Sequence, residues 1–463
     1  MVFNSIPYLV FLPLMVLVFY LTPHRFRWIP LLAGSCLFYM WFVPKYILIL
    51  LITIVIDYSA GILMEKYGDQ PKRKKTFMVL SITSTLLVLF IFKYLGFVND
   101  NVVKLCQSLG LDVRTSVKLI LPIGLSFHTF QSMSYVIEVY RGNQKAERHF
   151  GYYALYVMFF PQLVTGPIER PGNLLRQLHE EKRFSNDHLT RGLRLILFGF
   201  FIKMVVADNL GVYVDMVYSN PLEYNSLSVW IAMVFYSFQI YGDFFGYSTI
   251  ALGSALLMGY EISDNFKTPY LSKNIAEFWH RWHISLSTWF RDYVYIPMGG
   301  SRVKFWRWAW NILVVFVLSG IWHGANWTFL LWGLAHGILH IVEKGKRKTE
   351  KRKLSSLLSP LSTFLLVTLF WVFFRATDLS NIKEVFQAAF THFHEGQSLG
   401  VDWKGWVFLG VFVISDLLLF NTRFDHWCKG KPAVLRWVLY FGMIFSIIVF
   451  SSVENFPFIY FQF

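Results

Sequence analysis

Charge is scarce in this chain: Asp, Glu, Lys and Arg make up 15% of its 463 residues, where a soluble protein carries about 25%. Cysteine is also rare. Cys36, Cys106 and Cys428 are scattered, and they lack the spacing of a metal or redox site. These two scarcities argue against an ordinary soluble protein and against cysteine-based metal or redox chemistry.

Apolar and aromatic residues take the place of charge. The chain is 55% hydrophobic and 19% aromatic, with a mean hydropathy of +0.46, as is typical of a protein that meets two bilayer interfaces many times. Its net charge of +15 lies mainly in short segments between apolar runs. Membrane topology requires that pattern, so we expect membrane lipid rather than nucleic acid as the surrounding partner.

The apolar runs are near the length of about 20 residues that crosses a bilayer. They predict an all-α, polytopic protein with about 11–12 crossings, in which basic loops alternate with loops poor in Lys and Arg. With basic loops inside, the chain is predicted to be a multi-pass protein of the cell (inner or plasma) membrane with both termini extracytoplasmic. The runs are 3–21, 28–43, 46–64, 77–96, 117–138, 191–215, 228–258, 304–322, 326–342, 361–375, 404–420 and 436–452.

Two segments, 149–171 and 265–300, are too broken or too polar for simple crossings. Irregular backbone at membrane depth is tolerated only where protein or a water-filled cavity covers it. We therefore expect re-entrant or interfacial half-helices that line a central chamber. The whole chain is predicted to form one membrane domain, with a histidine-bearing region at 318–343 and an extracytoplasmic tail at 453–463.

Ionisable residues inside apolar segments are costly, so each is a candidate for function. His283 and His323 share an aromatic setting, in RWHISLSTW and IWHGANW, and Gly320 and Gly324 allow close approach to His323. The alternative is that both are interfacial histidines bonded to backbone carbonyls. The candidates are Asp57, His128, Asp243, His280, His283, His323, His336 and His340.

Two other groupings have simpler interpretations. His336 and His340 lie four residues apart and could bind a metal with His323, but no Asp, Glu or Cys reinforces them, so we expect no metal site. Asp57 and Asp243 are expected to be structural, holding an Arg, a His or backbone donors of a neighbouring helix. A proton relay in a secondary transporter is the alternative.

Four motifs resemble the membrane-bound O-acyltransferase (MBOAT) family in their order and spacing. The similarity runs through most of the chain. The IPMGGSR stretch at 296–302 is most similar to the branch that contains the alginate O-acetyltransferase membrane component. The branch that moves D-alanine toward teichoic acids is the nearest alternative. One departure from the alginate branch is Phe245, where that branch usually has Ser. The departure puts the polar role of the segment 241–248 in doubt. The motifs are FFPQLVTGPIER (159–170), YGDFFGYS (241–248), NFKTPYLSKNIAEFWHRWHISLSTWFRDYVYIPMGG (265–300) and LSGIWHGANWTFLLWG (318–333).

The resemblance implies that the chain is an O-acyltransferase that modifies an extracytoplasmic polysaccharide. In the family, the histidine of the WHG motif is tied to acyl transfer and matches His323, and the second functional histidine matches His283. Transfer from a thioester to an alcohol requires removal of the alcohol proton, which a neutral imidazole can accept. Candidate donors to the developing oxyanion are Asn326 and the indole N–H of Trp322 or Trp327.

The topology adds a direction to this chemistry. A cytoplasmic thioester donor, acetyl-CoA or an acyl-carrier protein, is expected to dock near Arg281, Arg291 and Arg302, with no tightly bound cofactor. An extracytoplasmic acetyltransferase partner with a serine-hydrolase-like site is implied for the final transfer to sugar. Tyr460, near the end of the tail, has two interpretations: an acyl relay, or part of an interfacial aromatic anchor.

Overall fold

The computed structural model describes residues 1–463 except 118, 165, 350–359, 452–457 and 460–463. Helices form its regular elements, and the described residues contain one isolated β-bridge, Tyr224 to Gln397, in place of any sheet. The prediction of an all-α, polytopic membrane protein is confirmed.

The chain divides into two compact units. Unit 1 comprises Met1–Leu193 and Ala251–Ser263, and unit 2 comprises Arg194–Ile250 and Asp264–Phe463. Two of the three dividing points fall inside long helices, α10 (Asn186–Phe200) and α12 (Ser226–Leu257), and the third, between Ser263 and Asp264, lies in the loop after α12. The single membrane domain expected for the whole chain stays a prediction.

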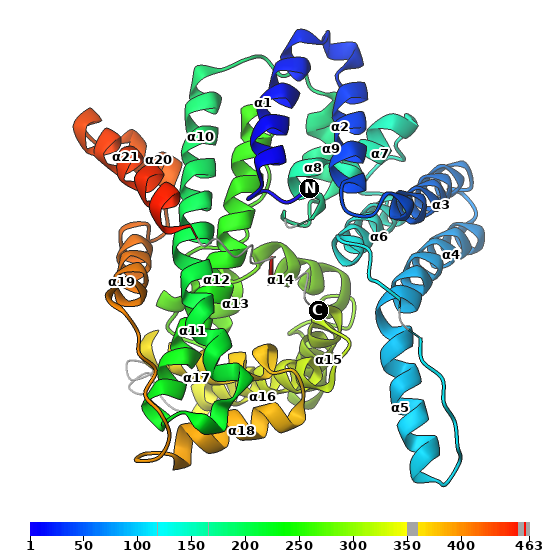
Figure 1. Cartoon of the computed structure of the whole chain (residues 1–463). Helices are drawn as coiled ribbons and strands as arrows, with labels where there is room; N and C mark the ends of the chain where they lie inside the picture. The colour runs from blue at the N-terminus through cyan, green and yellow to red at the C-terminus, as the bar shows by residue number, and fades with distance from the viewer. Residues whose placement is uncertain (118, 165, 350–359, 452–457, 460–463) are drawn as a thin grey trace. The chain divides into compact units, whose positions relative to one another are not determined.

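Unit 1 contains a bundle in which α3, α4 and α6 pack on one another (Figure 1). Asp57 of α3 is buried in this bundle and accepts hydrogen bonds from the hydroxyls of Ser81 (2.5 Å) and Thr85 (3.1 Å) on α4. Hydroxyl groups thus contact this carboxylate in place of the expected Arg, His or backbone donors. The helices of unit 1 are α1 (Ile6–Leu21), α2 (Trp28–Met40), α3 (Ile47–Lys66), α4 (Pro71–Leu89), α5 (Leu95–Ser108), α6 (Leu125–Arg141), α7 (Phe150–Met158), α8 (Phe160–Leu163) and α9 (Pro171–His179).

Unit 2 contains His283 and His323, the two histidines that the family resemblance implies are functional. In Figure 1, α10 continues into α11 through a π-helical turn, η4 (Phe201–Ala207), without a break. A second π-helical turn, η7 (Arg291–Tyr295), follows α14. The remaining helices are α11 (Asp208–Ser219), α13 (Ile275–Arg281), α14 (Ile284–Phe290), α15 (Phe305–His323), α16 (Trp327–Thr349), α17 (Pro360–Arg375), α18 (Leu379–Thr391), α19 (Trp403–Leu418), α20 (Phe424–Lys429) and α21 (Ala433–Phe450).

Helices α15 and α16 form a hairpin with very close backbone contact. A Cβ on Gly320 would lie 2.3 Å from the carbonyl oxygen of Phe329, and a Cβ on Gly333 would lie 2.3 Å from that of Phe316. Small residues let helix backbones approach in this way. The contact matters for the site because His323 is the last residue of α15.

The two segments expected to be irregular are broken into short helices. Within 149–171, α7 ends at Met158 and the four-residue α8 begins at Phe160, directly before Pro161. Within 265–300, α13 and α14 are separated by Trp282 and His283. Their place relative to a membrane, and the central chamber they are expected to line, stay predictions.

Five helices or runs of consecutive helices in the described residues are long and apolar enough to cross a membrane. Two more apolar helices are shorter, and all seven coincide with runs predicted from hydropathy. The chain is therefore a multi-pass membrane protein, while the number of crossings and the side of each terminus stay predictions. The five are Pro44–Lys66, Pro71–Ser108, Asn186–Ser219, Phe305–His323 and Ala433–Phe450, and the two shorter helices are Ile6–Leu21 and Pro360–Arg375.

Two local differences between the predicted runs and the observed helices have physical causes. In the predicted run 117–138 the helix begins only at Leu125, because Gly124 before it adopts a left-handed conformation (φ 77°). Helix α18 lies outside every predicted run because its apolar residues form a stripe rather than a continuous stretch. Its buried positions are Asn381, Ile382, Val385, Ala388 and Ala389, a helical spacing.

Candidate functional site

His283 lies at the N-cap of α14, fully buried, with a left-handed backbone (φ 41°). This conformation costs a non-glycine residue about 1–2 kcal/mol, so neighbouring contacts must hold it. Asn265 supplies them: its carbonyl accepts the N–H of Ile284 (2.9 Å), and its side-chain oxygen accepts the Ser285 hydroxyl (2.6 Å). Strain of this kind, held by surrounding structure, is concentrated at functional sites.

His323 ends α15 and is 3% exposed. Its ring packs edge-on against three aromatic rings, with centroid distances of 5.0 Å to Trp322, 5.1 Å to Trp332 and 5.2 Å to Phe374. A Cβ on the next residue, Gly324, would lie 2.1 Å from the ring of Phe329. The glycine beside His323 therefore makes room for a side chain of this same chain.

The fold brings the two predicted histidines together, although they are distant in sequence. The ring centroids of His283 and His323 are 6.5 Å apart, with 57° between the ring planes. Trp322 contacts both, at 6.1 Å from His283 and 5.0 Å from His323. Two buried imidazoles, the side chain that most often accepts a proton in catalysis, therefore lie within one aromatic cluster.

The three candidate oxyanion donors differ in their surroundings. The amide of Asn326 donates to the Thr377 carbonyl (2.8 Å), and its oxygen accepts the N–H of Thr328 (3.2 Å), so Asn326 serves the start of α16. Trp327 is 47% exposed. Trp322, buried and in contact with both histidine rings, is the candidate that the geometry favours.

The three predicted donor-side arginines are also in different environments. Arg281 is largely occupied: it pairs with Glu277 (3.0 Å), donates to Asn421 (3.0 Å) and lies over the Phe420 ring (5.0 Å). Arg291, whose side chain is 54% exposed, pairs only with its neighbour Asp292 among the described residues. Arg302 is exposed. Two of the three are therefore available to an anionic ligand.

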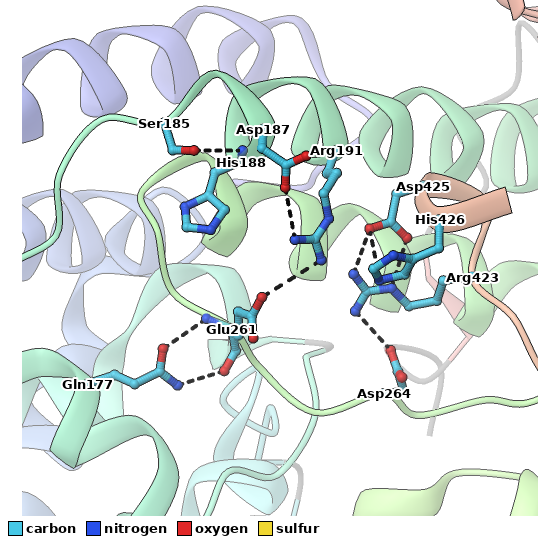
Figure 2. Close-up of polar contacts among 10 residues, drawn as sticks. All are labelled: Gln177, Ser185, Asp187, His188, Arg191, Glu261, Asp264, Arg423, Asp425 and His426. Atoms are coloured by element: carbon cyan, nitrogen blue, oxygen red, sulfur yellow. Dashed lines mark hydrogen bonds and ion pairs between the residues drawn. The ribbon is translucent and has the colours of Figure 1, made fainter. Parts of the chain in front are cut away.

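Polar contacts hold the segment that leads into 265–300 (Figure 2). In unit 1, Glu261 exchanges backbone hydrogen bonds with the side chain of Gln177 (2.7 and 2.9 Å) and lies 3.7 Å from Arg191. In unit 2, Asp264 pairs with Arg423 (3.4 Å), which also pairs with the buried Asp425 (2.8 Å). Asp264, the residue directly before the segment 265–300 that carries His283, is thus tied to the loop before α20.

His336 does not join the two central histidines in the part of the chain that the structure describes. It is fully buried, and its ring lies 5.0 Å from Trp332, 5.0 Å from Trp279 and 4.9 Å from Phe370. Trp332 contacts the rings of both His323 and His336. Aromatic rings therefore surround His336, and its packing supports the position of Trp332.

One buried ionic cluster was not predicted from the sequence. Lys203, 1% exposed, lies with its Nζ 2.5 Å from Asp208 and 2.6 Å from Asp243. Asp243 was expected to hold an arginine, a histidine or backbone donors of a neighbouring helix. It pairs with a lysine and also accepts a backbone N–H, that of Ile459 (2.7 Å). The lysine inside the apolar run 191–215 was the signal that could have revealed this cluster.

The tail and Phe245 complete the predicted positions. Tyr460 lies outside the described residues, but Phe458 and Ile459 before it are buried, at 0% and 5% exposure. Phe245, the departure from the usual serine, packs against Phe198 and Tyr241 with centroid distances of 5.9 and 5.5 Å. An aromatic contact therefore replaces a hydroxyl beside Asp243.

The sequence of the chain is similar to those of known proteins. Residues 143–375, which include both central histidines, match the model of the membrane-bound O-acyltransferase family. The chain is 36% identical over 394 residues to "Probable alginate O-acetylase AlgI" of Azotobacter vinelandii, covering 84% of this chain and 78% of that protein. It is 32% identical to the protein of that name in Pseudomonas putida, over the full length of both.

A third relative acts on a different polymer. The "Peptidoglycan O-acetyltransferase" of Helicobacter pylori is 33% identical over 385 residues, covering 77% of this chain and 72% of that protein. These matches, together with two buried histidines in an aromatic helical bundle, give one conclusion: the chain belongs to the membrane-bound O-acyltransferase family and is an O-acyltransferase.

Proposed function

We propose that this protein passes an acetyl group from a cytoplasmic thioester donor across the membrane, for O-acetylation of an extracytoplasmic polysaccharide. The observation that carries the proposal is the contact between the buried rings of His283 and His323, 6.5 Å apart. The names of the relatives, which act on alginate and on peptidoglycan, support acetyl as the group and a cell-surface polymer as its destination.

In the proposed reaction His323 is the general base. Its neutral imidazole accepts the proton of the acceptor hydroxyl while that oxygen bonds to the thioester carbonyl carbon. The carbon–sulfur bond then breaks, the ester remains on the acceptor, and the thiolate takes up the proton from the imidazolium. General-base assistance of this kind contributes about 10²–10⁴-fold. His283 shapes the thioester side of the site, and the Trp322 indole N–H donates to the developing oxyanion.

The acyl donor is acetyl-CoA or an acyl-carrier protein, and it is a substrate rather than a resident cofactor. Both carry a phosphopantetheine arm, whose phosphate would meet the exposed Arg291 and Arg302. Arg281, held by Glu277 and Asn421, supports the loop rather than the ligand. The surrounding aromatic cluster excludes water, which would otherwise hydrolyse the thioester.

On the other side, we propose that the acetyl group reaches the polysaccharide through an extracytoplasmic partner with a serine-hydrolase-like site. Tyr460 is either a relay that carries the acetyl group as an ester or part of an aromatic anchor. Replacing it with Phe keeps the aromatic ring and removes the hydroxyl. Loss of transfer in Tyr460→Phe would establish the relay, and unchanged transfer would leave the anchor.

Thioester turnover by the purified protein tests the proposal. Acetyl-CoA and an acetylated carrier protein are offered with an alcohol acceptor, and the released thiol and the ester are both measured. His323→Ala should lose turnover by about 10²–10⁴-fold while the protein stays folded by size-exclusion chromatography. Turnover of a D-alanyl thioester instead would favour the teichoic acid branch. Ion-dependent flux that survives in His323→Ala would indicate a transporter and end the proposal.

A further inference from the structure

The buried cluster of Lys203, Asp208 and Asp243 holds Ile459, one of the two described residues of the C-terminal tail. One carboxylate oxygen of Asp243 faces Lys203 Nζ at 2.6 Å, and the other accepts the backbone N–H of Ile459 at 2.7 Å. Asp208 faces the same Nζ at 2.5 Å. The cluster contains two carboxylates and one ammonium group, so one carboxylate has capacity left for another donor, and the tail supplies it.

Side chains on both sides of this hydrogen bond are packed. Phe458 is fully buried, with its ring 4.9 Å from Tyr247 and 5.6 Å from Phe244. Lys203 Nζ lies 5.6 Å from the centre of the Tyr247 ring. Phe458 and Ile459, the described residues of the tail, are therefore held on α12 by one main-chain hydrogen bond and one aromatic side chain.

This seat is next to the candidate site. The Phe244 ring contacts both Phe458, at 5.6 Å, and His283, at 4.7 Å with the ring planes perpendicular. One aromatic ring thus connects Phe458 with the second histidine. Nothing in the general-base chemistry of His323 requires this arrangement.

The position of the cluster follows from close helix packing. A Cβ on Gly199 of α10 would lie 2.7 Å from the carbonyl oxygen of Gly246 on α12, and a Cβ on Gly246 would lie 2.9 Å from Lys203 Cβ. These glycines bring the two backbones close enough for Lys203 to reach Asp243. The carboxylate is therefore held in place before any tail contact is made.

We propose that Asp243 is a positioning residue that holds the C-terminal segment by its main chain beside His283, so that transfer to the acceptor depends on the seated tail. Recognition of a backbone N–H fixes the path of the chain whatever side chain residue 459 carries. The effect on acyl transfer rests on the proposed function, whereas the seating of the tail does not.

The chain offers a matched pair of variants. Asp243→Ala removes the acceptor of the Ile459 N–H and leaves Lys203 paired with Asp208. Asp208→Ala leaves Lys203 paired with Asp243 and keeps the tail contact. Each variant retains one buried ion pair, so neither leaves the lysine uncompensated, and only the first removes the tail's partner.

The first measurement does not involve activity. Ile459→Cys is introduced into the full chain with Cys36, Cys106 and Cys428 replaced by Ser, and its rate of modification by a maleimide is measured. A hydrogen bond to a charged group is worth enough that Asp243→Ala should speed modification about tenfold or more. Asp208→Ala should leave the rate within about twofold. Equal rates in the parent and Asp243→Ala, or equal acceleration in both variants, would overturn the proposal.

The second measurement changes the tail alone, and it decides the matter if Asp243→Ala does not fold. Ile459→Pro removes the N–H that Asp243 accepts, and Ile459→Ala keeps it. Thioester consumption and transfer to an alcohol acceptor are followed separately. Ile459→Pro should lower transfer to the acceptor much more than Ile459→Ala, with thioester consumption maintained. Equal transfer in the two variants would overturn the positioning role, whereas absence of turnover in the parent would be a failure of the proposed function.

Discussion

Replacing Gly320 with alanine should disable the site without touching a reacting group. The new Cβ would lie 2.3 Å from the Phe329 carbonyl oxygen on α16, where ordinary contact needs about 3.5 Å. The oxygen belongs to the backbone and a Cβ is fixed rigidly to its own backbone, so α15 and α16 must separate by about 1 Å. Overpacking of this kind costs about 1–3 kcal/mol.

The displacement reaches His323, which lies one helical turn further along α15. A misplacement of about 1 Å can lower a rate about 10²-fold. We therefore expect Gly320→Ala to lower thioester turnover by about that factor and to lower the thermal unfolding midpoint of the detergent-solubilised protein. Tryptophan fluorescence during heating and release of free thiol measure the two effects.

Gly442→Ala is the matched control, because a Cβ there meets nothing within 4 Å. The same substitution in the middle of an open helix should be neutral or stabilising by about 0.5–1 kcal/mol. Gly333→Ala, whose Cβ would lie 2.3 Å from the Phe316 carbonyl oxygen, should behave like Gly320→Ala. If Gly320→Ala matched Gly442→Ala in both midpoint and turnover, the role of the hairpin contact in placing His323 would be refuted.

Four further substitutions test other parts of the structure. Asn265→Ala removes the acceptor of the Ser285 hydroxyl at 2.6 Å, which should cost about 1–3 kcal/mol and lower turnover through His283; unchanged heating curves and turnover would contradict this. Arg291→Ala breaks only an exposed ion pair, worth at most about 1 kcal/mol, so it should raise the donor KM without changing the unfolding midpoint. Arg423→Ala, by contrast, removes the guanidinium that contacts both carboxylate oxygens of the buried Asp425 and should destabilise by about 3–5 kcal/mol. Asp57→Asn should lower the unfolding midpoint but keep thioester turnover; complete loss of turnover in a folded variant would show that the Asp57 carboxylate takes part in the chemistry.

Hydropathy and motif spacing determine much of the helical architecture of this protein and several of its candidate site residues. The long apolar helices and both broken segments are visible in the order of residues, because burial in lipid acts on each stretch of chain by itself. Residue type also singled out His283, His323 and Asp243, since an ionisable side chain among apolar neighbours is costly wherever the chain goes. The resemblance in the WHG segment then gave His323 its expected role.

Only the tertiary structure decides which of these costly groups meet. It places the rings of His283 and His323 together, pairs Lys203 with Asp243 and seats Ile459 on the same carboxylate. It also commits the Asn326 amide to Thr377. Hydropathy and helical periodicity are local properties of the chain, whereas such pairings depend on which helix faces come into contact and how closely glycines let them approach.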